Sequence, residues 1–108
     1  TANRATELDG ATTTATLDTS ADVYYIDPSV GSAYTLTLKS TSPAPPANSE
    51  IEVVVYSPGI ATVSVVRESA VEILGFGAAA FGSARFKFLA SSWRLVSFCG
   101  TGASPTNP

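Results

Sequence analysis

The fold of this chain is decided by the stretch ARFKFLASSWRLVSFCG, at residues 84–100. Apolar residues alternate with charged or polar ones on both sides of a short polar break at residues 90–92. A period of two across a brief gap is typical of an antiparallel hairpin. The stretch also holds three of the five phenylalanines and the only tryptophan. We therefore expect the hydrophobic core to form around this hairpin.

Short β-prone runs occupy much of the remaining chain. The clearest is AYTLTLKS at residues 33–40, where apolar and polar residues alternate strictly. The others are VYYI at 23–26, EIEVVVY at 50–56, TVSVVR at 62–67 and VEIL at 71–74. Turn residues separate the runs at spacings of about 8–12 residues. This rhythm predicts an all-β fold, a β-sandwich or jelly-roll-like barrel of about eight short antiparallel strands.

The length and the composition of the two ends predict one domain with loose termini. The 108 residues are enough for a single core. We expect residues 1–10 to be a flexible arm that is ordered by a partner, residues 11–100 to be the β-sandwich domain, and residues 101–108 to be a flexible tail. Thr1 is a small residue of the kind exposed when an initiator methionine is removed, so we expect a complete small gene product without a leader.

The composition offers little catalytic chemistry. There is no histidine and a single cysteine, Cys99, so the usual nucleophile–base pairs and transition-metal sites are missing. Nine carboxylates are present, but nothing in the sequence brings two of them into one cleft. Asp18 and Asp22, or Asp27, do not have the spacing of a calcium loop, which favours loop capping. We expect no enzymatic activity, no cofactor and no metal.

The charge pattern argues against nucleic acid and against a membrane span. The net charge is −3, and no apolar run reaches the length of about 18 residues that a span needs. Arg85, Lys87 and Arg94 are expected to project from one side of the hairpin. They form either a solvated face that pairs with Glu52 or Glu72, or a basic contact for an acidic groove on a partner protein.

Several strands are apolar on both faces, as where Trp93 and Leu95 alternate with Val96 and Phe98. A domain of this size does not bury both faces of most strands, and large exposed apolar patches usually mark interfaces. We therefore predict a homo-oligomer, with a trimer favoured. The candidate interface residues are Arg4, Leu8, Val54, Tyr56, Val66, Arg85, Lys87, Arg94, Val96 and Phe98.

The order of these runs carries a family resemblance over residues 18–99. Its parts are YTLTLKS at 34–40, a proline-rich connection, IEVVVYS at 51–57, TVSVV at 62–66 and FKFLASSWRLVSF at 86–98. This order resembles small β-domain virion proteins of tailed bacteriophages, namely head decoration (capsid cement) proteins and related tail-fibre modules. The resemblance implies a non-catalytic virion protein, made in the host cytoplasm, that binds the major capsid protein on the outer surface of the head and stabilises it.

The alternative within this resemblance is a tail-fibre or receptor- and carbohydrate-binding domain. In that role Tyr24, Tyr25, Tyr56 and Trp93 would supply sugar-stacking faces, although Trp93 is expected to fill the core. Fibres are usually long chains with coiled or repeated stalks, and neither is evident in the sequence. The small size therefore favours decoration.

Overall fold

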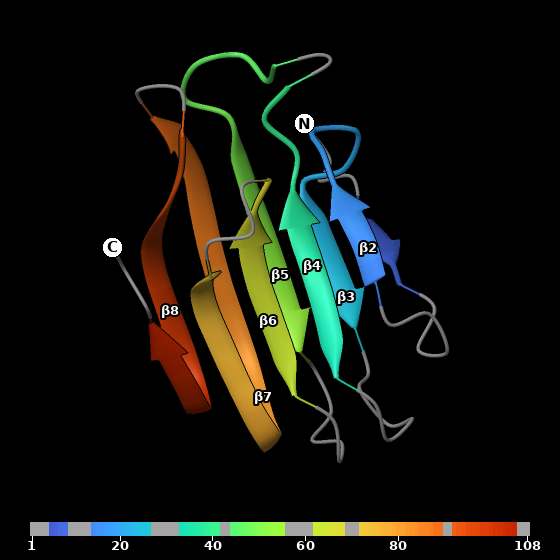
Figure 1. Ribbon diagram of the computed structural model, residues 1–108, viewed down its shortest axis with the longest axis vertical. Helices are drawn as coiled ribbons and strands as arrows, with labels where there is room; N and C mark the ends of the chain where they lie inside the picture. Colours follow the sequence, from blue (N-terminus) through green and yellow to red (C-terminus); the bar gives the residue numbers. More distant parts are fainter. Residues whose placement is uncertain are drawn as a thin grey trace.

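The computed structural model describes residues 5–8, 14–26, 33–41, 44–55, 62–68, 72–89 and 92–105, with the backbone alone considered at 78–80 and 101–105. Within these residues the fold is all-β and sandwich-like, as the sequence predicts (Figure 1). The strands are β1 (Ala5–Glu7), β2 (Thr14–Leu17), β3 (Val23–Ile26), β4 (Tyr34–Leu38), β5 (Glu50–Val55), β6 (Val63–Arg67), β7 (Glu72–Leu89) and β8 (Ser92–Pro105).

The first six strands alternate between two layers. β1, β3 and β5 pair in parallel in one layer, and β2, β4 and β6 pair in parallel in the other. Each odd strand and the even strand after it thus form one coil, and three coils stack along the molecule. Figure 1 shows β2, β4 and β6 in front of β3 and β5. The prediction of antiparallel pairing is wrong for the pairs among these six strands. An alternating pattern is the same in either pairing, and a strand in the opposite layer supplies each crossover.

The long strand β7 joins the two layers. Its first part, at 72–76, pairs antiparallel with β6, and its second part, at 82–87, pairs antiparallel with β5. β8 then follows β7 back across both layers in the predicted antiparallel hairpin. Residues 101–105, expected to belong to a flexible tail, are the end of β8. These residues pair with β7 between Leu74 and Phe81, because β7 begins at Glu72, well before the predicted hairpin at residues 84–100.

Two glycines permit the bend in this hairpin. Gly82 and Gly100 are directly opposite each other, with φ values of 147° and 132°. A Cβ on Gly82 would collide with the carbonyl of Cys99 and lie 2.7 Å from the Cα of Gly100. A Cβ on Gly100 would collide with the carbonyl of Phe81 in the same way. Only a residue without a side chain fits where the two backbones change layers.

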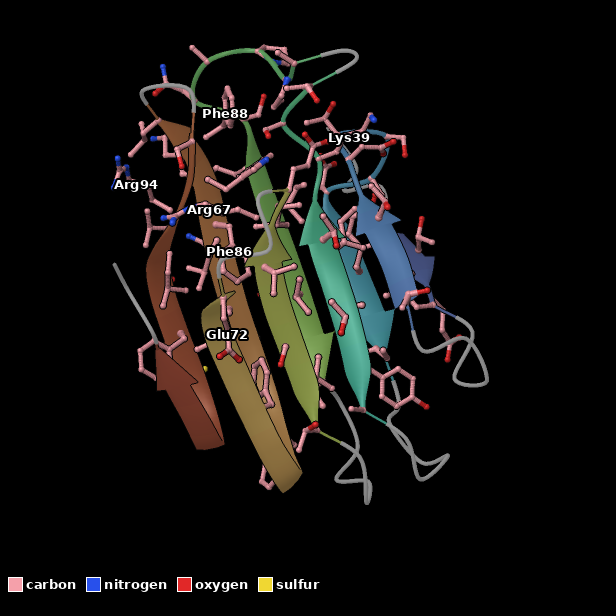
Figure 2. All side chains as sticks on the ribbon, viewed as in Figure 1. Lys39, Arg67, Glu72, Phe86, Phe88 and Arg94 are labelled. Atoms are coloured by element: carbon pink, nitrogen blue, oxygen red, sulfur yellow. The ribbon has the colours of Figure 1, made fainter. Side chains whose placement is uncertain are left out.

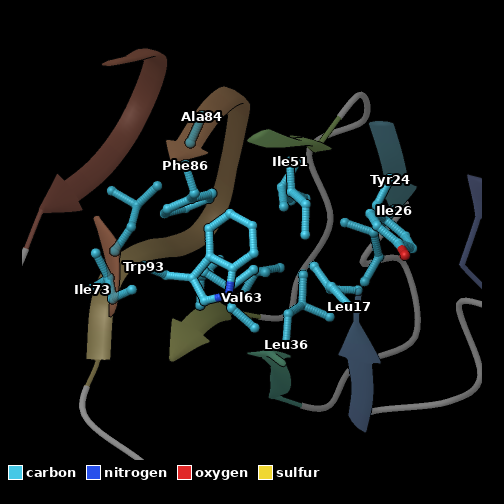
Figure 3. Packing of buried hydrophobic residues seen from close by; sticks show 14 of the residues in the cluster. Leu17, Tyr24, Ile26, Leu36, Ile51, Val63, Ile73, Ala84, Phe86 and Trp93 are labelled. Atoms are coloured by element: carbon cyan, nitrogen blue, oxygen red, sulfur yellow. The ribbon is translucent and has the colours of Figure 1, made fainter. Parts of the chain in front are cut away.

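The core lies between the layers and is built from their inward-facing positions. No polar or charged side chain is buried among the described residues. Trp93 is 1% exposed and lies against Phe88, with ring centroids 5.3 Å apart. Its Nε1–H donates to the carbonyl of Lys39 at 2.9 Å, which ties β8 to the chain beyond β4. Figure 3 shows the indole in the middle of the buried cluster, near Phe86 and Val63. The predicted hairpin at residues 84–100 thus supplies Ala84, Phe86, Phe88 and Trp93 to the core, and the rest of the chain supplies its other members.

Candidate interaction surface

The predicted interface residues do not form one patch. Arg4 and Tyr56 lie outside the described residues. Leu8 packs partly against the core, so the prediction that it meets a partner is not supported by its position. Val54 and Val66 are half-buried and lie in opposite layers, on β5 and β6. These residues do not share one surface.

The remaining five predicted residues lie on the β7–β8 hairpin, distributed over its two faces. They are joined by Phe81, which sequence reasoning missed because it sits in a stretch of small residues. We call this group the hairpin surface: Phe81, Arg85, Lys87, Arg94, Val96 and Phe98. Four large apolar side chains are notably exposed among the described residues, and three belong to this surface, at 43% for Phe81, 47% for Val96 and 42% for Phe98. The exposed apolar area of the described chain is therefore concentrated on one hairpin.

A β-bulge sets which face each side chain takes. Arg85 is opposite Ser97, whereas Phe86 is opposite Leu95, so Val96 is the extra residue. An unbroken period of two over residues 93–98 predicts one shared face for Arg94, Val96 and Phe98, and the bulge shows that prediction to be wrong. Residues directly opposite in an antiparallel pair lie on the same face. Arg94, opposite Lys87, is on the outer face, while Phe98, opposite the buried Ala84, is on the inner face.

The basic side chains of the hairpin share one carboxylate. Glu50 Oε1 is 4.0 Å from Arg85 Nε, and Glu50 Oε2 is 3.8 Å from Lys87 Nζ. The predicted partners, Glu52 and Glu72, make neither of these contacts, although Glu52 is directly opposite Arg85, as Glu50 is directly opposite Lys87. All three side chains are a third or more exposed, so these ion pairs contribute little to stability.

Arg94 completes the basic group without a carboxylate of its own. It lies opposite Lys87, is exposed, and has no ion-pair partner in the part of the chain that the structure describes. Figure 2 shows its side chain beyond β8, on the far side from the other strands. Like charges directly across a pair of strands repel each other. The outer face of the hairpin is thus a basic spot on an acidic chain.

A shallow pocket of about 230 Å³ adjoins this group. Its lining residues are Glu52, Ser83, Ala84, Arg85, Ser97, Phe98 and Cys99. Cys99 is exposed and unoxidised, and its Sγ lies 3.6 Å from Ser83 Oγ. No lining residue is a general base of the kind that activates a thiol, such as histidine.

A second pocket, of about 250 Å³, lies among loops and is lined by Asp18, Thr19, Ser20, Lys39, Ala44 and Pro45. The Asp18 carboxylate accepts hydrogen bonds from the hydroxyl of Ser20 and from its backbone N–H at 3.0 Å. These bonds, followed by one from Tyr24 and the charge of Lys39, lower the pKa of Asp18. The expected loop-capping role of Asp18 is confirmed by this geometry. Its carboxylate is engaged in holding the turn.

Other candidate chemistry is not assembled in the described residues. They hold no group of three or more His, Cys, Asp or Glu side chains that could bind a metal. The described residues also contain no helix that is long and apolar enough to cross a membrane. Of the proposed sugar-stacking residues, Tyr24 and Trp93 are buried, Tyr25 is 36% exposed, and Tyr56 lies outside the described residues.

No protein-family model matches the chain, and no curated protein matches its sequence. The hairpin surface is therefore the feature on which a functional argument rests.

Proposed function

We propose that this chain is a structural protein of a phage virion that acts by binding other protein chains. The observation that carries the proposal is the hairpin surface, where exposed Phe81, Val96 and Phe98 and three basic side chains lie on the same two strands, with Phe98 on the inner face and the basic side chains on the outer face. Apolar area concentrated in one place and bordered by charge is typical of protein interfaces. The family resemblance of the strand order supplies the virion context.

The first form of the proposal is head decoration. The hairpin surface would contact an acidic groove of the major capsid protein on the outside of the head, and the bound protein would stabilise the shell. Opposite charges at such a contact favour rapid and specific docking. A homotrimer is the proposed assembly, since one copy of the surface per subunit would then clamp several capsid subunits.

The second form is a module of a tail fibre, and the stacked coils support it. The sequence favours decoration, because it shows no repeated stalk. The six strands β1–β6 nevertheless form three coils stacked in parallel. Units of this kind lengthen by adding further coils along one axis, as a fibre requires. The coils therefore favour the fibre over the head, whereas the burial of Trp93 and Tyr24 gives a sugar-binding tip less support.

Electron microscopy and heat stability test the two forms together. Virions of the encoding phage are labelled with gold antibody against this chain, and particles with and without the chain are heated until they release DNA. Label on heads, with earlier DNA release from particles lacking the chain, is expected for decoration. Label on fibres with unchanged release assigns the protein to the fibre. Virions that bind no antibody would refute both forms.

A further inference from the structure

We infer that the free edge of β8 binds an extended, acidic segment of another protein, which joins the sandwich as an added strand. The inference specifies how the hairpin surface binds and what chemistry its partner has. It rests on the proposed function only for the claim that another protein chain is bound.

The first observation is the length of the edge. β8 has 14 residues and pairs with β7 alone among the described strands. The outward N–H and C=O groups of an edge strand are a template for a further strand. The Trp93 carbonyl already accepts a hydrogen bond from Arg67 Nε at 2.9 Å, so the template lies beyond Trp93 along β8. Arg94 is the only charged residue in β8, and Pro105 stands at its very end, so most of this edge lacks the charges and prolines that usually protect edges.

The second observation is a row of residues that crosses one layer. Register connects Thr6, Tyr24, Val53, Ala84 and Phe98 on the inner face, from β1 to β8. The row ends in an exposed threonine at β1 and in a 42%-exposed phenylalanine at β8. A polar residue suits a terminal strand that faces water, whereas an aromatic ring on the inner face needs cover. Both end strands of the row are exposed, and the β8 end is the one that presents an aromatic ring.

The third observation is the charge at that end. Arg94 projects beyond β8 on the outer face, opposite Lys87, and has no carboxylate partner in the described chain. A strand added at β8 would place an outward side chain next to Arg94. A glutamate or aspartate there would relieve the repulsion between the two cations. The partner therefore carries an acidic residue beside Arg94 and an apolar one beside Phe98.

The charge also indicates that this strand is not the β8 of a second copy. β8 reads SWRLVSFCGTGASP and contains no acidic residue. Antiparallel pairing of two β8 edges would leave both Arg94 side chains without a carboxylate, and parallel in-register pairing would place them side by side. An acidic strand from a different protein would place a carboxylate beside Arg94 and an apolar side chain beside Phe98.

Two synthetic peptides serve as probes in an NMR titration of the full chain labelled with ¹⁵N. Both have eight residues and alternate valine with a charged residue, which is glutamate in one and lysine in the other. We expect the glutamate peptide to shift the amide signals of residues 92–99 and to slow their hydrogen exchange. The lysine peptide should bind about ten-fold more weakly or not at all, because its charges meet Arg94.

Variants separate edge binding from general stickiness. Arg94→Glu should lower the affinity for the glutamate peptide about ten-fold and raise that for the lysine peptide, whereas Arg94→Lys should leave the preference unchanged. Phe98→Ser should weaken both peptides. Tyr25→Ser is the control, since Tyr25 is also an exposed aromatic residue, at 36%, but lies on β3 outside the hairpin surface, and it should have no effect on peptide binding. Trp93 fluorescence confirms that each variant is folded.

Several results would overturn the inference. Equal affinity for the two peptides, shifts that map away from β8, or no binding of the glutamate peptide at millimolar concentration would each do so. If hydrogen exchange of the β8 amides slows as the protein concentration rises with no peptide present, the strand bound at β8 is a second copy of this chain and not an acidic partner. Normal incorporation of Arg94→Glu and Phe98→Ser into virions would refute edge binding but leave the virion role intact. If the glutamate peptide binds at β8 but the protein is absent from virions, the virion role is refuted and edge binding stands.

Discussion

Replacement of Gly100 by alanine tests the account of the bent hairpin. Gly100 has a φ of 132°, a region that side-chain-bearing residues rarely adopt, and it lies opposite Gly82. A Cβ there would collide with the carbonyl of Phe81, a backbone group that cannot rotate away. The Gly100→Ala variant must therefore either separate β7 from β8 at the bend or change its own backbone angle.

The expected loss follows from these two penalties. A strained backbone conformation costs about 1–3 kcal/mol, and overpacking costs a further 1–3 kcal/mol or so. We expect the free energy of unfolding to fall by about 3 kcal/mol. For a domain of this size, such a loss lowers Tm by roughly 12–24 °C. Urea unfolding followed by Trp93 fluorescence, with calorimetry for Tm, measures the change.

A matched control is available on the same hairpin. A Cβ at Gly75 would meet Glu72 Oε2 at 2.7 Å, and this is the mobile end of a side chain rather than backbone. Gly75→Ala should therefore change stability by less than about 1 kcal/mol. Gly82→Ala should resemble Gly100→Ala, and the double variant should lose less than the sum because both open the same crossing. A Gly100→Ala protein that melts within about 3 °C of the parent would show that the strands do not cross so closely.

Three further expectations follow from single contacts. Trp93→Phe removes the hydrogen bond to the Lys39 carbonyl and should lower the free energy of unfolding, measured in urea melts, by about 1–3 kcal/mol. An unchanged free energy would show that water replaces the indole N–H at that carbonyl. The pKa of Asp18 is lower in the folded state than in the unfolded chain, so its contribution to stability is full above about pH 4 and is lost as the pH falls through the folded pKa. Melts at pH 2–6 should show this loss in the parent and not in Asp18→Asn, and parallel curves would contradict it. Glu50→Gln breaks two exposed ion pairs and should change stability by less than about 1 kcal/mol, so a larger loss would show that the basic side chains need this carboxylate.

The local strands and the closing hairpin were predictable because they depend on neighbouring residues. A period of two at residues 33–40 and 84–100 identifies strands with one buried face, and both occur as predicted. Parallel pairing was not predictable in this way, since the same alternation serves both pairings. It depends on which strands meet across the molecule, and the sequence contains no local signal for that.

The hairpin surface was predicted only in part, for a similar reason. Arg85, Lys87 and Arg94 were expected on one side, and the register places them on one face. The bulge at Val96 was not foreseen, and a single extra residue moves every later side chain of that strand to the other face. Phe98 therefore lies on the inner face and not beside Arg94. The contact of Arg85 with Glu50 is diagonal, since Glu52 is the residue directly opposite Arg85, and the register alone does not give it.

This bulge also links the fold to the proposed binding role. Without the extra residue, Phe98 would lie on the outer face with Arg94, and the inner row would end at β8 in a smaller neighbouring side chain. With it, the aromatic ring occupies the inner face at the uncovered edge while the guanidinium stays outside. The two faces of one strand edge thus present opposite chemistry to whatever pairs with it. An added strand satisfies both faces at once, because its own side chains alternate between an inner and an outer face, whereas a flat protein surface would reach only one of them.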